Sequence, residues 1–179
     1  MNSTLVMHAS SRARVLGALL IVAIGLWSGA ASGQDGPAGV PQSLPLSSLM
    51  VETAAKGDVA LSVQVADTDA ARQTGLMFRT EMPEREGMLF IFPELARVSF
   101  WMKNTYIPLD LLFIGDDGTI LQITRETEPF SLAPIPSERP ARAVLEINGG
   151  ASARLGIAVG DRLRHDLFSR PAPPSAPRP

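Results

Sequence analysis

The segment Trp101–Thr105 places an aromatic ring, a cation and an amide next to one another. In a regular strand, the side chains of Trp101 and Lys103 point to one face and that of Asn104 points to the other. All three can meet one ligand only if the strand ends or bulges near Met102, and we expect it to end there because the Asn-Thr pair favours a turn. A lysine beside a tryptophan can then bind an anion or an oxygen-rich ligand on the ring. The alternative is a core tryptophan, with Lys103 reaching out to water.

Two arginines, Arg72 and Arg79, flank Gly75 and can supply further positive charge. A turn at the glycine would let both guanidinium groups approach one side of the fold, and we predict that Arg79 reaches the pocket of Lys103. Guanidinium groups bind carboxylates or phosphates through bidentate hydrogen bonds. The alternative is that Arg72 lies on a solvated helix face and that Arg79 forms a salt bridge.

Two carboxylates, Asp110 and Glu146, each lie inside an apolar strand pattern. Burying a carboxylate is costly unless it is paired or lies at an edge. The two side chains could form a general acid/base pair of the kind that glycosidases use, or they could bind one hard cation. The alternative is a structural pairing with a cation such as Lys103, or exposure of alternate strand residues. A carboxyl separation of roughly 5–10 Å in one cleft would support the enzyme, whereas opposite faces would exclude it.

These residues need a scaffold, and the rest of the sequence predicts a mostly β one. Apolar residues alternate with small or polar ones over 59–65, which indicates a half-buried strand. The glycines and aspartates of 115–118 predict a hairpin, because they tolerate the positive φ angles of tight turns. We expect a compact antiparallel sheet or small barrel of about seven short strands with one or two short helices. Strands are predicted at 59–65, 88–92, 98–102, 109–114, 119–123, 143–147 and 162–165, and helices at 70–74 and 151–155.

One small domain is expected over residues 49–168, a length that suits a single hydrophobic core. Residues 34–48 are rich in Gly, Pro and Ser and are predicted to be a flexible linker. Residues 169–179 hold five prolines and are predicted to be a disordered tail.

Residues 1–33 have the features of a signal peptide. Arg12 and Arg14 precede the apolar run Val15–Trp27, and small residues follow the run. The run is shorter than the roughly 20 residues that span a bilayer, so we predict cleavage before Gln34. The folded domain is then expected to be periplasmic or secreted. The alternative is an uncleaved segment that anchors the chain in the inner membrane, which is the only membrane contact we expect.

The composition excludes several functions. The sequence has no cysteine and only two histidines, which excludes disulfides, thiolate metal sites and His-rich metal sites. Residues 1–33 hold two of the 16 basic residues and none of the 18 acidic ones, so the remaining chain carries a net charge of −4. It has no stripe of basic residues, so it lacks the clustered positive charge that is typical of nucleic-acid-binding proteins. Since no nucleotide-binding or metal-binding motif is present either, we expect no cofactor and no metal.

An ordered set of short segments resembles one known family. The segments are Gly-Leu-Met-Phe-Arg at 75–79, Gly-Met-Leu-Phe-Ile-Phe at 87–92, Phe-Trp-Met-Lys-Asn-Thr at 100–105, Ile-Pro-Leu-Asp-Leu at 107–111, Val-Leu-Glu at 144–146, and Gly-Ile at 156–157 with Gly-Asp at 160–161. Together they resemble the domain of unknown function 192 (DUF192, UPF0127) over residues 58–166. The resemblance implies a small all-β or α+β domain, often secreted or membrane-tethered in bacteria and archaea, and it implies no particular activity.

Two functional hypotheses follow. The first is a non-enzymatic exported module that binds an unknown small molecule or a component of the cell envelope. Its site is expected around Trp101, Lys103 and Asn104, with polar support from Arg72, Arg79, Asp110 and Glu146. The second is a hydrolase-type enzyme that acts on an envelope saccharide through the carboxylate pair. The first is favoured because the sequence contains no complete catalytic set.

Overall fold

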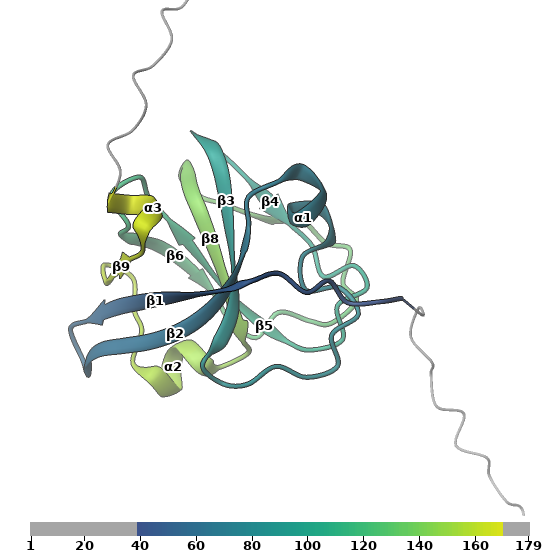
Figure 1. Ribbon diagram of the computed structural model, residues 1–179, viewed down its shortest axis with the longest axis horizontal. Helices are drawn as coiled ribbons and strands as arrows, with labels where there is room; N and C mark the ends of the chain where they lie inside the picture. The colour runs from purple at the N-terminus through teal and green to yellow at the C-terminus, as the bar shows by residue number, and fades with distance from the viewer. Residues whose placement is uncertain (1–38, 170–179) are drawn as a thin grey trace, which may run out of the picture. The chain divides into compact units, whose positions relative to one another are not determined.

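The computed structural model describes residues 39–169, and seven strands within them form one sheet (Figure 1). The strand order across the sheet is β6-β5-β8-β3-β2-β1-β9. A second, two-stranded sheet pairs β4 with β7. The mostly β prediction is therefore confirmed. The strands are β1 (Leu46–Thr53), β2 (Gly57–Ala66), β3 (Glu86–Ala96), β4 (Ser99–Phe100), β5 (Leu109–Ile114), β6 (Ile120–Thr124), β7 (Ile135–Pro136), β8 (Ala141–Asn148) and β9 (Arg162–Arg164).

The strand pairs are antiparallel except for β2 and β3, which run parallel. Parallel neighbours need a long crossover connection, and residues 67–85 supply it. This crossover contains the helix α1 (Asp69–Thr74). The connection therefore carries α1 away from the sheet plane, which later places it beside the candidate site.

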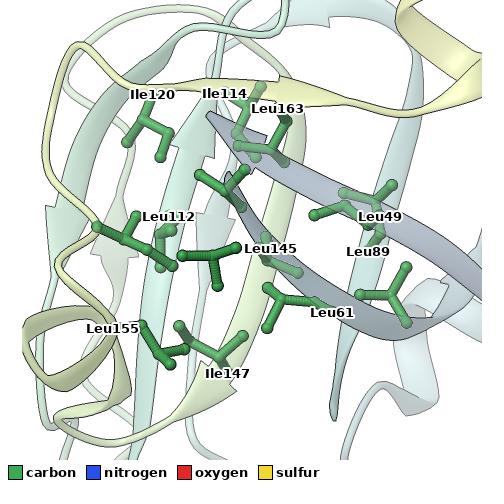
Figure 2. Close-up of a cluster of buried hydrophobic side chains, with 14 of the residues drawn as sticks. Leu49, Leu61, Leu89, Leu112, Ile114, Ile120, Leu145, Ile147, Leu155 and Leu163 are labelled. Carbon is green, nitrogen blue, oxygen red and sulfur yellow. The ribbon is translucent and has the colours of Figure 1, made fainter. Parts of the chain in front are cut away.

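The sheet curls because its two ends are joined. An isolated bridge pairs Thr119, before β6, with Arg162 at the start of β9. Leu163 also donates a backbone hydrogen bond to the Gly118 carbonyl, where a φ of 86° suits glycine. The curled sheet encloses a cluster of apolar side chains that we call the inner core (Figure 2). The inner core includes Leu49, Val51, Leu61, Val63, Leu89, Leu112, Ile114, Ile120, Leu145, Ile147, Leu155 and Leu163.

The opposite face of the sheet carries a second cluster, which we call the outer core. Successive residues of a strand point to opposite faces, so β5 gives Leu112 to the inner core and Leu111 to the outer core. Helix α1 and the 99–107 segment cover this second face. The outer core consists of Ala66, Ala71, Leu76, Met82, Met88, Phe90, Met102, Leu109, Leu111, Phe113, Ala141 and Val144.

The two predicted helices are confirmed. The side chain of Thr68 caps α1 by accepting a hydrogen bond from the Ala71 N–H, and Gly75 follows the helix with a φ of 52°. Helix α2 (Ala151–Leu155) likewise ends at a left-handed Gly156. A further single turn, α3 (Asp166–Ser169), was not predicted. None of the helices in residues 39–169 has the length and apolar character needed to cross a membrane.

Two sequence predictions need correction. Strand β1 begins at Leu46, inside the predicted linker 34–48, because its residues pair with β2 over eight positions. The Gln42 amide also donates to the carbonyls of Ala71 and Gly75, so part of that segment packs on the domain. In addition, the predicted strand 98–102 is reduced to β4. The predicted signal peptide and all but the first residue of the predicted tail lie outside the described residues.

Candidate ligand-binding site

A pocket of about 460 Å³ opens on the outer-core face of the sheet. Its wall comes from α1 with the turn after it, from β3, from β4 with the residues that follow it, and from β8. These elements are distant in sequence, and Figure 1 shows α1 and β4 side by side next to β3. The side chains that matter most for chemistry are Arg72, Phe92, Trp101, Lys103, Thr105 and Glu146.

Glu146 supplies a buried acid to this pocket. It lies in the middle of β8, opposite Met88 of β3 and Leu111 of β5, and it is only 4% exposed. Its carboxyl group has no hydrogen bond or ion pair with any residue of the range 39–169, and it lines the open pocket. Burial disfavours the charged form and raises the pKa of Glu146 to about 8. The side chain is therefore mainly a neutral carboxylic acid at pH 7, able to donate one hydrogen bond and accept others.

Trp101 and Lys103 form the outer part of the wall. The Lys103 ammonium lies 5.2 Å from the centre of the Trp101 ring, which is a cation–π distance. Trp101 is 50% exposed, so it is not the core tryptophan of the alternative interpretation. Met102 between them is buried in the outer core. The two predicted residues therefore meet on one side of the chain, at the pocket.

The strand carrying these residues ends early, as predicted. Strand β4 stops at Phe100, and the Thr105 N–H donates to the Met102 carbonyl in a turn. Asn104 adopts a φ of 55°, a left-handed conformation that asparagine tolerates. Its side-chain amide approaches the Met77 sulfur at 3.7 Å, and Asn104 is not among the residues that line the pocket. The predicted convergence therefore includes Trp101 and Lys103 but not Asn104.

The two arginines separate. Arg72 lines the pocket, where it donates to the carbonyls of Asp67 and Ile91 and forms an ion pair with Asp69. Its guanidinium also lies 5.7 Å from the centre of the Phe92 ring. The Arg72 guanidinium is therefore engaged in contacts within the protein.

Arg79 does not reach the pocket, which corrects the prediction. Its guanidinium donates to the Gln42 carbonyl at 3.2 Å, in the segment that precedes β1. The physical reason lies in the turn after α1. Phe78 has a φ of 66°, and the Phe78 N–H donates to the Asn104 carbonyl. The chain is thereby redirected just before Arg79.

The structure does not bring Asp110 and Glu146 together in one cleft. Across β5 and β8, Leu111 is opposite Glu146, whereas Asp110 is opposite Ile147. Cross-strand partners share a face, and the two carboxyl groups therefore lie on opposite faces of the sheet.

Asp110 has a structural role instead. It is fully buried and accepts hydrogen bonds from the backbone N–H groups of Glu126, Gly150 and Ser152. The Ser152 hydroxyl donates a fourth at 2.6 Å. The carboxylate thus joins the start of α2 to the loop after β6.

Sequence reasoning missed the aromatic wall behind the lysine. Phe90 and Phe100 meet edge to face at 5.1 Å between ring centres, and Phe92 and Phe100 do so at 6.3 Å. Phe90 and Phe92 occupy alternate positions of β3, as does Met88, which is opposite Glu146. The alternation of 88, 90 and 92 could have shown that these side chains share one face of β3, and their sharing of that face with Glu146 follows from the register of β3 against β8. Within residues 39–169, no group of three or more histidine, aspartate or glutamate side chains is placed to hold a metal ion.

The chain was compared with known proteins. Residues 50–165 match the family DUF192, described as "Uncharacterized ACR". A crystal structure of a "putative transcription regulator" from Sinorhizobium meliloti 1021 is similar, with 42% identity, a TM-score of 0.68, and coverage of 72% of this chain and 99% of the other. A protein of unknown function from Novosphingobium aromaticivorans DSM 12444 has 39% identity and a TM-score of 0.66, over 72% and 94% of the two chains.

Comparison with curated proteins gave no match. The family match nevertheless extends from the second half of β1 to β9 and includes all the other strands of the curled sheet. It also includes all the residues that line the pocket. Because the match covers well over half of the chain, the protein belongs to the DUF192 family.

Proposed function

We propose that this protein is an exported domain that binds a small anionic or oxygen-rich molecule in the pocket of Trp101, Lys103 and Glu146. One observation carries the proposal. Glu146 lines an open pocket, is buried, and has no partner within residues 39–169. A ligand in the pocket can therefore form the hydrogen bonds with this carboxyl group that the protein does not supply.

The outer wall supports the same function. Lys103 forms no salt bridge within the described part of the chain, and its ammonium lies on the Trp101 ring. Trp101 is half exposed although it is a large apolar side chain. Pockets that combine an aromatic wall with a few polar groups are typical of small-molecule sites.

Binding is favoured over hydrolysis by a carboxylate pair. Asp110 lies on the other face of the sheet and is occupied by four hydrogen bonds. The second carboxylate at the pocket is Asp69, which is paired with Arg72. Glu146 therefore has no free carboxylate partner in the pocket. This geometry supports ligand binding better than hydrolysis by two carboxylates.

The cellular setting is proposed from residues 1–33. Their basic start and the apolar run Val15–Trp27 support export by a signal peptide. We propose no nucleic-acid partner, since the chain after residue 33 carries a net charge of −4. Mass spectrometry of the periplasmic fraction should give a mature N-terminus between residues 31 and 35. Recovery of the full-length chain in the membrane fraction would instead support a retained anchor.

The binding proposal can be tested with Trp101 itself as the reporter. The sequence has two tryptophans, Trp27 and Trp101, so a Trp27→Phe chain reports on the pocket alone. We expect its fluorescence to change saturably with at least one of inorganic phosphate, acetate, D-glucose and D-glucuronate. Glu146→Ala should abolish the response, whereas Val159→Ala, at an exposed residue that lines neither this pocket nor the one beside Trp101, should retain it. No response to any of the four compounds, or a response that survives Glu146→Ala, would contradict the proposal.

A further inference from the structure

The pocket carries one uncompensated positive charge. Four ionisable side chains line it: Asp69, Arg72, Lys103 and Glu146. Arg72 is paired with Asp69, and burial raises the pKa of Glu146 to about 8, so that it is mainly neutral at pH 7. The two cations and one anion leave a charge of +1, located on Lys103. A ligand of matching charge therefore carries one negative group that can approach the Lys103 ammonium.

The rest of the pocket wall consists of flat aromatic surfaces and of polar groups that can hydrogen-bond to hydroxyls. Phe92, Phe100 and Trp101 contribute rings to the pocket. Glu146 and the hydroxyls of Ser99 and Thr105 are polar, and a neutral acid or a hydroxyl can both donate and accept hydrogen bonds. A ligand ring whose faces carry apolar C–H groups and whose edge carries hydroxyl groups can pack on the aromatic side chains and hydrogen-bond to the polar ones. The pocket volume of about 460 Å³ lies within the range of about 300–1,000 Å³ that is usual for small-molecule sites.

We propose that the ligand is an acidic saccharide, bound with its carboxylate at Lys103, its ring against Trp101 and Phe92, and a hydroxyl at Glu146. This inference rests on the proposed function and narrows it to a substrate class. Inorganic phosphate matches the charge but is too small to use the aromatic wall and Glu146 together. A neutral sugar matches the wall but leaves Lys103 without a partner. The combination of the three features selects a sugar that bears a carboxylate.

The test is isothermal titration calorimetry of the full chain with three probes: D-glucuronate, D-glucose and inorganic phosphate. At low salt, D-glucuronate should bind about tenfold more tightly than D-glucose, the equivalent of about 1.4 kcal/mol for one charge-assisted contact. Lys103→Gln should abolish this preference, whereas Lys103→Arg should retain it. The matched control is Lys56→Gln, because Lys56 is the only other lysine and donates to the Arg154 carbonyl away from the pocket.

The outcomes separate the two proposals. Equal affinity for the two sugars, tighter binding of phosphate, or a preference that survives Lys103→Gln would overturn the acidic-saccharide inference. In each of these cases a probe still binds, and the proposed function stands if the binding requires Glu146. If none of the three probes binds, the acidic-saccharide inference fails, and the proposed function fails with it when acetate also gives no fluorescence response. Thermal unfolding of each variant verifies that it is folded, and Lys103→Gln should unfold at nearly the same temperature as the parent because it replaces a residue at the surface of the pocket.

Discussion

Asp110 and Glu146 lie on neighbouring strands of one sheet and face opposite sides of it. Both are buried acids, but only Asp110 is satisfied by the protein, through four hydrogen bonds. Glu146 faces the pocket without a partner in the described residues. Two buried acids that differ by one position in cross-strand register thus have two different roles. Asp110 holds loops together, whereas Glu146 is left available to a ligand.

The buried acid predicts a pH-dependent stability. The pKa of Glu146 is about 8 in the folded protein and 4.5 ordinarily, so the folded state binds the proton more tightly. Its contribution is therefore fully present below pH 4.5 and is lost progressively as the pH rises toward 8. Between these values the free energy of unfolding should fall by at most about 1.4 kcal/mol per pH unit relative to a Glu146→Gln variant. Urea unfolding at pH 5, 6, 7 and 8 measures this difference.

The comparison with Glu146→Gln isolates one group, because all other titrating residues are common to both proteins. Above pH 8 the difference between them should become constant. A difference that does not change between pH 5 and 8 would show that Glu146 has an ordinary pKa and is solvated in the pocket.

The hydrogen bonds of Asp110 predict a large loss of stability in Asp110→Asn. The amide nitrogen would replace an oxygen that accepts from backbone N–H groups, so at least one buried donor loses its partner. Each such loss costs about 1–3 kcal/mol, and we expect a total of about 3 kcal/mol in urea unfolding. Binding of D-glucuronate by the folded fraction should not change, since the side chain lies on the other face. Lost binding at full stability would mean that Asp110 reaches the pocket after all.

Much of the fold could be predicted from local sequence. Thr68 and Gly75 bracket α1, and the glycines and aspartates of 115–118 form a hairpin, because caps and tight turns depend on the conformations of single residues. Alternation identified β2. Strand β1 was missed, since its first residues lie in a Pro- and Ser-rich segment and its order comes from pairing with β2, which the segment alone does not show.

The site was predictable only where its residues are neighbours in the chain. Trp101 and Lys103 lie two positions apart, so their meeting depended on a single turn. The face of the sheet on which Glu146 lies relative to Asp110 depends on the register of β8 against β5, and neither strand alone encodes that register. The direction of Arg79 depends on the backbone of Phe78, whose positive φ is uncommon for an aromatic residue and is held by a contact with Asn104.

The exposure of Trp101 predicts that its removal affects binding more than folding. Half of its surface is solvent-accessible, so Trp101→Ala should cost about 1 kcal/mol, against about 3–5 kcal/mol for a fully buried aromatic residue. Phe113→Ala, which removes a buried ring of the outer core, is the reference for the larger value. Chemical denaturation gives both numbers, and calorimetry should show lost binding for Trp101→Ala. Equal destabilisation by the two substitutions would mean that the Trp101 ring is a core residue.

The close approach of β3 and β8 predicts that Gly87 is required to position Glu146. A Cβ at residue 87 would lie 2.4 Å from the Glu146 carbonyl oxygen, and backbone atoms of a paired strand cannot move aside cheaply. Gly87→Ala should therefore destabilise the domain by about 3 kcal/mol, at the upper end of overpacking effects, and displace β8 at the pocket. Gly57→Ala is the control, since its Cβ meets no atom within 4 Å and the substitution adds only left-handed strain of about 1–2 kcal/mol. Thermal unfolding ranks the two variants, and their binding of D-glucuronate below the unfolding temperature shows whether Glu146 has moved. If Gly87→Ala is as stable as Gly57→Ala and binds normally, the two strands are further apart than the structure places them.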